Sequence, residues 1–259
     1  MGDYCKHIMI PKELLAEIGE KKGLTNKEYI EKDYFQDTIL FNLFKKTNMF
    51  VFKGGTALYK LYQLPRFSED LDFSIYGEKE AHDIEETIKA IVATSNLSVK
   101  SVKKTKDSLL VKISCKGILT RYNTIRMDIS LKNKVLAGIE VKNYVSEYVD
   151  INPFVMRVLK REEMIAEKIH ALLARKKARD LFDIFFLLRI APLDENLIKK
   201  KLKIFDLAYD CKVLKERIDD LEEIWEKELR TFILGELPEF KTVEEFVLSK
   251  LDTVKIDQR

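Results

Sequence analysis

Few residues of this 259-residue chain can cross-link it or interrupt its helices and strands: it has three cysteines, five prolines and nine glycines. Cys5, Cys115 and Cys211 lie far apart, without the close spacing of zinc ligands, and an odd number favours reduced thiols. No apolar stretch approaches the roughly 18 to 20 residues that a membrane span needs. The first eleven residues also lack the continuous apolar core of a signal peptide. We therefore expect a cytoplasmic protein that has no membrane partner.

The overall composition is that of a globular protein. Hydrophobic residues make up 46% of the chain and charged residues 34%, which excludes disordered and fibrous classes. The formal net charge is only +3, but it is unevenly distributed. Residues 100–134 carry ten Lys or Arg against two Asp, and residues 157–179 carry eight Lys or Arg against three Glu. Two such segments predict a surface for a polyanion such as nucleic acid, with a solvated surface of a lysine-rich protein as the alternative.

Hydrophobic periodicity predicts two domains of different character. Helices are expected at residues 11–20, 27–46 (capped by Asn26), 56–62 and 81–94, and strands at 49–53, 71–76, 97–102, 109–114 and 124–131. After about residue 153 nearly all the sequence has helical periodicity, with helices expected at 161–175, 179–190, 194–204, 212–230 and 242–251. This order indicates a mixed α/β domain over residues 1–153 and a helical domain over residues 154–259.

A glycine pair lies between the first predicted strand and the helix that follows it. Gly54 and Gly55 end the strand, and Thr56 begins the helix. The N-terminus of a helix exposes unpaired N–H groups, and glycine lets a phosphate approach the backbone closely. The pair therefore predicts a phosphate site, although many such turns use glycine for conformational reasons alone.

Acidic residues follow on polar faces of two predicted strands. Side chains alternate along a strand, so Asp70, Asp72 and Ser74 share one face. In the segment 125–131 the same alternation places Asp128 on a polar face with Arg126. If the two strands are neighbours, Asp70, Asp72 and Asp128 converge, and their oxygen ligands suit Mg²⁺ or Mn²⁺. The alternative is that each polar face is only solvated.

Three carboxylates beside a phosphate-binding turn suit two-metal phosphoryl transfer. In this hypothesis Asp70 and Asp72 bridge both ions, and Asp128 binds the ion that activates the acceptor hydroxyl. The second ion binds the triphosphate and stabilises the departing pyrophosphate.

Two motifs carry a resemblance to a known family. The segments Lys53-Gly-Gly-Thr-Ala-Leu58 and Arg66-Phe-Ser-Glu-Asp-Leu-Asp72 resemble the AbiEii/AbiGii toxin family of the nucleotidyltransferase (DNA polymerase β-like) superfamily. Further segments agree with it: Glu31-Lys-Asp-Tyr-Phe35, Glu167-Lys-Ile169 and Arg179-Asp-Leu-Phe-Asp183. One departure is Gly55, where the superfamily often has a serine whose hydroxyl contacts phosphate. Thr56 is expected to supply that contact one residue later.

The resemblance implies an α+β fold, with a small sheet flanked by helices and followed by an all-helical C-terminal domain. It also implies transfer of a nucleoside monophosphate from an NTP to an acceptor. Some relatives pair with a transcriptional-regulator antitoxin, and MenT-type relatives modify the acceptor ends of tRNA. By this resemblance the nucleotide-binding residues are Gly54, Gly55, Thr56, Arg66, Ser68, Lys168 and Asp183, and the catalytic residues are Asp70, Asp72, Asp128, Lys168 and Asp180.

The downstream residues also have structural interpretations. Ile165, Ile169 and Leu172 form an apolar stripe, and Lys168 lies beside it. Asp180 and Asp183 share a face of an otherwise apolar helix, where a buried acid needs a partner. An ion pair between Asp183 and Arg179 is the structural alternative to a role in nucleotide binding.

A few other residues are expected to be structural. Glu31 and Asp33 are expected to tether the N-terminal helix to the core by pairing with a basic residue, and Trp225 is expected to pack in the helical domain.

Three functions are compatible with these patterns. The leading hypothesis is a Mg²⁺-dependent nucleotidyltransferase that acts on RNA, with tRNA favoured, and that has a cognate antitoxin. The second keeps the chemistry but transfers the nucleotide to a protein hydroxyl. The third is a non-catalytic nucleotide- or nucleic-acid-binding module.

Overall fold

The computed structural model describes residues 10–77, 80–95, 97–132 and 134–252. Cys5 lies outside these residues, as do residues 1–9 of the segment in which no signal peptide is expected. By its internal contacts the chain forms two units. The first comprises the chain up to residue 61 with residues 67–134 and 141–158, and the second comprises residues 62–66, 135–140 and 159 onward.

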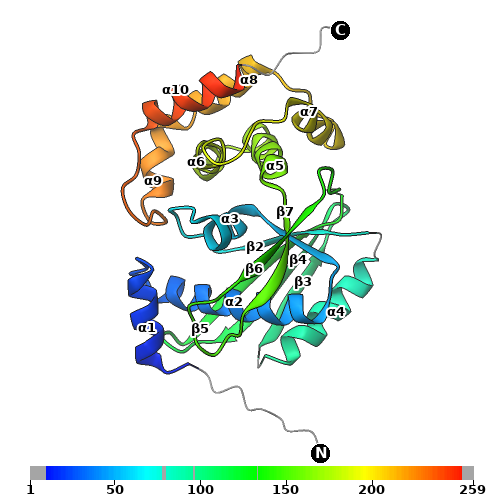
Figure 1. The fold of residues 1–259 in the computed structure, drawn as a ribbon, viewed down its shortest axis with the longest axis vertical. Helices are drawn as coiled ribbons and strands as arrows, with labels where there is room; N and C mark the ends of the chain where they lie inside the picture. Colours follow the sequence, from blue (N-terminus) through cyan, green and yellow to red (C-terminus); the bar gives the residue numbers. More distant parts are fainter. Residues whose placement is uncertain (1–9, 78–79, 96, 133, 253–259) are drawn as a thin grey trace, which may run out of the picture. The chain divides into compact units, whose positions relative to one another are not determined.

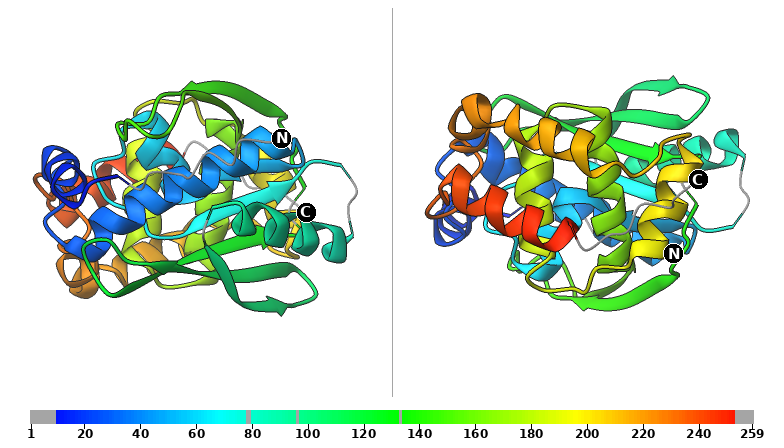
Figure 2. Two further views of the ribbon diagram at one scale, coloured as in Figure 1. Left: turned by 90° about the horizontal axis from the view of Figure 1, so that it is seen from below. Right: turned by 90° about the horizontal axis from the view of Figure 1, so that it is seen from above.

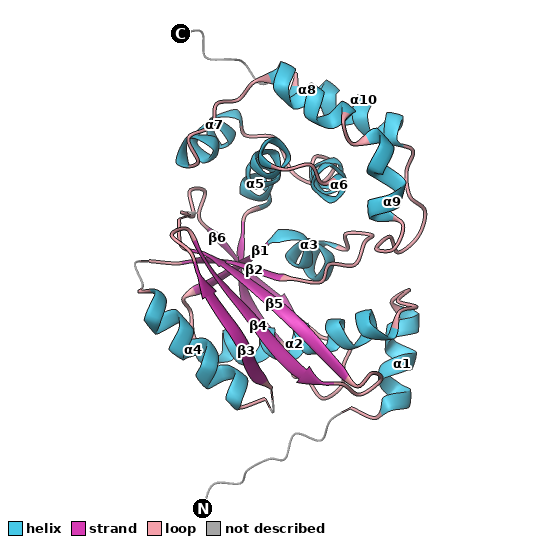
Figure 3. Ribbon diagram, turned by 180° about the vertical axis from the view of Figure 1, so that it is seen from behind, coloured by secondary structure: helices cyan, strands magenta, loops and turns pink. Residues whose placement is uncertain are grey.

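The first unit is built on a mixed sheet. In the described residues this sheet has seven strands in the order β3-β4-β5-β2-β1-β7-β6 (Figures 1 and 3). The strands are β1 (Phe50–Lys53), β2 (Leu71–Ile75), β3 (Ser98–Lys104), β4 (Ser108–Lys116), β5 (Tyr122–Ser130), β6 (Ile139–Tyr144) and β7 (Phe154–Leu159). The pairs β3–β4, β4–β5 and β1–β2 are antiparallel, whereas β2–β5 and β1–β7 are parallel.

Two helices cover one face of this sheet. Helix α2 (Lys27–Lys46) contacts β5, and α4 (Ala81–Ala93) contacts β3 and α2. They lie side by side along the sheet in Figure 2 (left), and α1 (Lys12–Lys21) packs against α2. The ring centroid of Phe44 on α2 lies 6.4 Å from that of Phe73 on β2. The face of the sheet that carries Phe73 is therefore the one that α2 covers. The polar residues that alternate with this apolar set therefore lie on the opposite face of the sheet.

The second unit is helical in its C-terminal part. Its helices are α5 (Arg161–Ala174), α6 (Ala178–Leu187), α7 (Glu195–Ile204), α8 (Cys211–Asp219), a short 3₁₀ turn (Glu222–Ile224), α9 (Trp225–Leu229) and α10 (Phe240–Leu251). Helix α5 packs against α6, α7 and α8, and α10 packs against α6 and α8 (Figure 2, right). Ile165, Ile169 and Leu172 are fully buried, which confirms the predicted apolar stripe of α5. Trp225 is also buried, and its indole N–H donates to the carbonyl of Pro238 at 3.0 Å, so its predicted packing role is confirmed.

The predicted fold class is confirmed, and most predicted elements are present. Asn26 caps α2 by accepting the N–H of Glu28 at 2.8 Å, and α2 ends at Lys46 as expected. The sequence pattern does not predict β6 or β7. A short apolar run such as residues 154–159 fits a strand or a helix equally well by periodicity, and pairing with β1 decides the outcome. The single helix predicted at 212–230 is wrong, because α8, the 3₁₀ turn and α9 occupy this segment.

The second unit includes segments that lie before residue 153. Residues up to 158 in β7 belong to the first unit, and the domain division at 153/154 stays a prediction. No helix among the described residues is long and apolar enough to cross a membrane.

Candidate functional site

Two aspartates lie opposite each other on neighbouring strands of the first unit. Asp72 on β2 and Asp128 on β5 are Cα partners in the parallel ladder. The strand adjacency on which the predicted acidic site depends is thus present. Asp70 lies immediately before β2, and Lys53, the last residue of β1, is the partner of Asp72 on its other side. The next residue on this face, Ser74, is buried and pairs with Ser130.

Gly54 packs its backbone against Asp72. Helix α3 (Gly54–Tyr62) starts directly after β1, two residues earlier than predicted. Gly54 has φ of +75°, a conformation that L side chains rarely adopt. A Cβ atom at this position would lie 2.2 Å from Oδ2 of Asp72. Glycine therefore brings the first turn of α3 against the carboxylate, at a helix end whose N–H groups have no partner within the helix.

Thr56 and Gln36 hold the loop that leads to Asp70. The Thr56 hydroxyl is buried and donates to the backbone carbonyl of Asp70, with a second contact to that of Ser68 at 3.3 Å. The side-chain amide of Gln36 on α2 donates to the carbonyls of Ser68 and Glu69 at 2.8 and 3.0 Å. The hydrogen bond of Thr56 thus positions the acidic loop.

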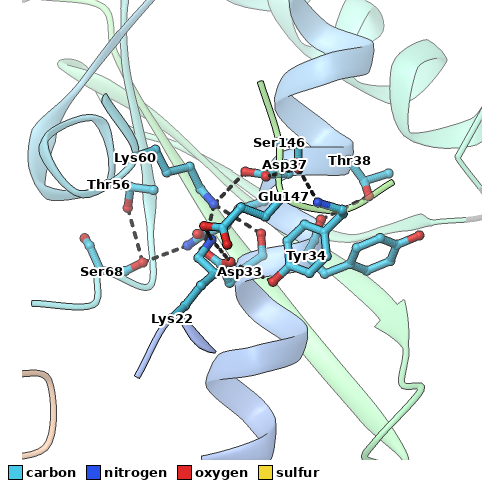
Figure 4. A network of polar contacts seen from close by, with 12 residues as sticks. Lys22, Asp33, Tyr34, Asp37, Thr38, Thr56, Lys60, Ser68, Ser146 and Glu147 are labelled. Atoms are coloured by element: carbon cyan, nitrogen blue, oxygen red, sulfur yellow. Dashed lines mark hydrogen bonds and ion pairs between the residues drawn. The ribbon is translucent and has the colours of Figure 1, made fainter. Parts of the chain in front are cut away.

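A buried ionic network joins α3 to α2 (Figure 4). The Lys60 ammonium lies 2.8 Å from Oδ1 of Asp33 and 2.6 Å from Oδ1 of Asp37, and all three side chains are inaccessible to solvent. Lys22 is a further partner of Asp33. Burial alone would raise the pKa of Asp33, but Lys60 and Lys22 outweigh it and hold that pKa below its usual range. Burial would also lower the pKa of Lys60, yet Asp33 and Asp37 raise it.

Hydroxyl groups complete this network. Tyr148 donates to Oδ2 of Asp33 at 2.7 Å, Tyr144 donates to Oδ2 of Asp37 at 2.9 Å, and Ser146 donates to the same oxygen at 2.6 Å. The tethering role predicted for Asp33 is confirmed, including its basic partners. The network fixes α3, and with it Gly54, against α2.

Glu31 tethers α2 in a different way. Its carboxylate accepts the backbone N–H groups of Ile118, Leu119 and Thr120, and the hydroxyl of Thr120 at 2.5 Å. Burial would raise the pKa of Glu31, but these hydrogen bonds lower it. Glu31 therefore binds the turn between β4 and β5 and not the basic residue that the sequence suggested.

The second unit contains a buried ion cluster. Arg66 donates to both oxygens of Asp183 from Nε and Nη2, each at 2.7 Å. Lys168 lies 2.6 Å from Asp183 and 3.1 Å from Asp180, and Arg175 donates to Asp180 at 2.8 Å. The two aspartates are almost completely buried.

The cluster determines the charge states of its members. Burial would raise the pKa of Asp183, but Arg66 and Lys168 lower it, and Lys168 and Arg175 do the same for Asp180. Burial would lower the pKa of Lys168, whereas Asp183 and Asp180 raise it. Asp183, Asp180 and Lys168 are therefore charged near neutral pH.

The suggested pair between Asp183 and Arg179 is wrong. Arg66 and Lys168 are the ionic partners of Asp183, whereas the guanidinium of Arg179 lies over the ring of Phe232, 5.5 Å from its centroid. Sequence reasoning also missed Lys60 and Gln36. The only sequence signal for Lys60 is its position one helical turn after Thr56.

A model of the family described as "Nucleotidyl transferase AbiEii toxin, Type IV TA system" matches residues 38–247. This range includes Gly54, Asp72, Asp128, Lys168 and Asp183, and it covers most of the chain. The chain belongs to the AbiEii nucleotidyltransferase toxin family. Among curated proteins, no significant match to this AbiEii sequence was found.

Solved structures share the fold of this AbiEii-family chain. MenT4, a nucleotidyltransferase toxin from Mycobacterium tuberculosis H37Rv, superposes with a TM-score of 0.63 at 19% identity, covering 96% of this chain and 91% of MenT4. A candidate nucleotidyltransferase from H. pylori gives 0.54 at 22% identity, covering 89% and 99% of the two chains. JHP933 from Helicobacter pylori gives 0.52 at 22% identity, covering 88% and 95%.

The acidic residues of this AbiEii chain offer oxygen donors on neighbouring strands. Asp72 and Asp128 are adjacent, half-buried oxygen donors, and the backbone of Gly54 packs against Asp72. Oxygen donors of this kind suit Mg²⁺ or Mn²⁺. Within the described residues, no group of three or more His, Cys, Asp or Glu side chains is arranged to hold a metal. Asp72 and Asp128 supply oxygen donors of the kind that such a cation needs, and metal binding by Asp70, Asp72 and Asp128 stays a prediction.

Proposed function

We propose that this protein transfers a nucleoside monophosphate from an NTP to an RNA acceptor, with tRNA the favoured class, and releases pyrophosphate. The observation that carries this proposal is the opposition of Asp72 and Asp128, with the backbone of Gly54 packed against Asp72, in a chain of the AbiEii family. Two carboxylates beside the free N–H groups of a helix suit a cation that is shared with a phosphate.

Asp70, Asp72 and Asp128 are the proposed ligands of Mg²⁺ or Mn²⁺. A bound divalent cation lowers the pKa of an attacking hydroxyl and neutralises charge on the phosphates. The side chains of Asp72 and Asp128 come from paired strands, so their separation is fixed by the sheet. Thr56 and Gln36 fix the loop before Asp70.

The first turn of α3 is the proposed phosphate site. Gly54 and Gly55 have no side chains to block a phosphate, and the first N–H groups of the helix are donors without helical partners. The sequence suggested that the Thr56 hydroxyl contacts the phosphate. This hydroxyl donates its proton to the backbone carbonyl of Asp70, so we propose that Thr56 positions the acidic loop instead.

The nucleotide-binding roles of Arg66, Ser68, Lys168 and Asp183, and the role of Asp180 in catalysis, rest on the family resemblance. In the second unit, Arg66, Lys168 and Arg175 carry three positive charges against the two aspartates. Arg66 and Lys168 are the cations of this cluster to which the resemblance assigns nucleotide binding. The family description also places its members in type IV toxin–antitoxin systems, and we propose a cognate antitoxin as a partner.

The acceptor can be identified in one experiment. The purified protein is incubated with Mg²⁺, each radiolabelled NTP in turn, and total tRNA, and label is followed on RNA and on protein alongside pyrophosphate release. Label on RNA that is lost in Asp72→Asn supports the proposal. Label on protein alone indicates a protein hydroxyl as acceptor, and the absence of label and pyrophosphate indicates a binding module. Either of these outcomes overturns the proposal.

A further inference from the structure

Beside Asp128, the face of the sheet opposite to α2 and α4 carries exposed basic side chains. Strands β4 and β5 alternate strictly between fully buried residues and half-buried or exposed ones. Apart from the exposed Ser98 and Ser101 of β3, the exposed residues on this face are cationic or aromatic: Lys103 on β3, Lys112 on β4, and Tyr122 and Arg126 on β5. These residues lie in the basic segment 100–134, and the strand register shows which of its charges share one surface.

The register arranges these side chains in rows that run across the strands. In one row Lys103 pairs with Leu110, Leu110 with Asp128, and Asp128 with Asp72. Leu110 is half-buried and forms an apolar floor between Lys103 and the acidic pair. Strands are spaced about 4.8 Å apart, so Lys103 lies about 10 Å from Asp128.

Two further rows cross the strands at increasing distances from Asp128. Lys112 pairs with Arg126, and Lys116 pairs with Tyr122. At about 3.3 Å per residue, Arg126 lies about 7 Å and Tyr122 about 20 Å along β5 from Asp128. The face is therefore a strip of positive charge that begins at the acidic pair and ends at an aromatic ring.

The charges of this strip are available to a ligand. Arg126 is 47% exposed, and its Nη2 lies 3.6 Å from Oδ2 of Asp128, which is 35% exposed. An ion pair this exposed contributes little to stability, so Arg126 can turn toward a phosphate at small cost.

Tyr122 has the properties of a base-stacking platform. It is 65% exposed, and the guanidinium of Arg121 lies over its ring, 5.5 Å from the centroid. An exposed ring among cations suits single-stranded nucleic acid, whose unstacked bases bind aromatic side chains while the backbone follows positive charge. A duplex has no free base to place on such a ring.

We propose that this face of β3, β4 and β5 binds the single-stranded end of the RNA acceptor. Tyr122 stacks on a base, Lys103, Lys112 and Arg126 contact phosphates, and the terminal hydroxyl lies at Asp128. The inference rests on the proposed function and assigns its acceptor site. In the reaction the hydroxyl oxygen bonds to the α-phosphorus, the bond from this phosphorus to the bridging oxygen breaks, pyrophosphate leaves, and the hydroxyl proton passes to solvent.

Binding of total tRNA in the absence of NTP tests the basic part of the strip. The double variant Lys103→Glu/Lys112→Glu is compared with Lys104→Glu, which makes the same type of charge change on the alternate face of β3. We expect the double variant to raise the Kd for tRNA at least tenfold more than Lys104→Glu. We also expect it to reduce the slope of log Kd against log salt by about 0.7 per lost contact.

A second pair of variants tests the stacking platform. Tyr122→Ala is expected to weaken binding of a single-stranded RNA oligonucleotide by about 5- to 150-fold, whereas Tyr122→Phe keeps the ring and binds as the unmodified protein does. The melting temperature of each variant shows that it is folded. The assignment is overturned if the double variant and Lys104→Glu change the Kd for tRNA equally. It is also overturned if Tyr122→Ala and Tyr122→Phe bind the oligonucleotide equally well.

The transfer assay separates this failure from failure of the proposed function. If the unmodified protein labels RNA and the strip variants label it equally well, only the acceptor site is wrong. If the unmodified protein labels no RNA, the proposed function is wrong as well.

Discussion

Asp72 and Asp128 are direct neighbours across the parallel pair β2–β5, although they are far apart in the sequence. Two carboxylates in this position repel each other unless a cation lies between them. The sheet holds them there because the apolar residues on the other face, such as Phe73 and Ile129, are completely buried. The fold thus holds two carboxylates side by side, with the guanidinium of Arg126 3.6 Å from Oδ2 of Asp128.

The first prediction concerns this pair. Asp72→Asn and Asp128→Asn are each expected to lower the rate of pyrophosphate release at least about 100-fold, since a catalytic metal contributes several kcal/mol to transition-state stabilisation. The melting temperature measured without Mg²⁺ shows that each variant is folded. Addition of Mg²⁺ is expected to raise the melting temperature of the unmodified protein and not that of the variants.

Ser74→Ala is the matched control for these two variants. Ser74 lies on the same strand, and its buried hydroxyl has no hydrogen-bond partner. Its loss is expected to be neutral for stability and activity. Full activity in Asp72→Asn would contradict the proposed metal site.

The second prediction concerns the glycine turn. Gly54 and Gly77 have nearly the same backbone conformation, with φ of +75° and +79°. A Cβ at Gly54 meets Asp72, whereas a Cβ at Gly77 meets no atom within 4 Å. Gly77→Ala is therefore expected to cost about 1–2 kcal/mol in the free energy of unfolding, from backbone strain alone. Gly54→Ala is expected to cost more and to lose nucleotide transfer, as measured by urea denaturation and pyrophosphate release. Equal costs and retained transfer would show that the turn does not position Asp72.

Several features of the site follow from local sequence. The alternation in residues 70–75 and 125–131 assigns Asp72 and Asp128 to polar faces, because side-chain direction along a strand has a period of two. The glycine pair and the Asn26 cap also depend on properties of single residues. These expectations need no knowledge of distant parts of the chain.

Other features depend on long-range pairing and could not be predicted. Lys60 reaches Asp33 and Asp37 only because α3 packs on α2, and Arg66 reaches Asp183 across more than a hundred residues. A local rule instead suggested Arg179 as the partner of Asp183, since residues four apart are neighbours on a helix. Strand β7 is defined by its pairing with β1, which its own composition does not specify.

The third prediction concerns the ion cluster of the second unit. Arg66→Met leaves Asp183 buried with one cation fewer, and we expect a loss of about 3–5 kcal/mol in the free energy of unfolding. Arg175→Ala is the control, because the Arg175 side chain is 57% exposed and Asp180 keeps Lys168. It is expected to cost about 1 kcal/mol or less. Denaturant titration of both variants measures the difference, and equal losses would contradict a buried, tightly paired cluster.

The fourth prediction concerns acid stability and the network of Asp33 and Lys60. The pKa of Asp33 is held below its usual range by Lys60 and Lys22. A carboxyl whose pKa is lower in the folded than in the unfolded state stabilises the fold above the unfolded pKa, about 3.9, and this contribution is lost as the pH falls toward the folded pKa. The free energy of unfolding is therefore expected to be nearly constant from about pH 8 to pH 5 and to fall below about pH 4.

Lys60→Met tests the cause of this pH dependence. It leaves Asp33 buried without its main partner, so we expect a loss of about 3–5 kcal/mol at pH 7. The difference in the free energy of unfolding between the two proteins is expected to narrow below about pH 4. Protonation of Asp33 in the unfolded state then lowers the stability of the unmodified protein, whereas the variant, in which Lys60 no longer lowers the pKa of folded Asp33, loses less. Lys21→Met is the control, since Lys21 pairs with Glu17 on an exposed face of α1, and it is expected to leave the whole profile unchanged. The free energies of unfolding of Lys60→Met and of the unmodified protein could instead differ by a constant amount down to pH 3. That result would mean that the lost stability comes from packing of the lysine stem, and not from its charge.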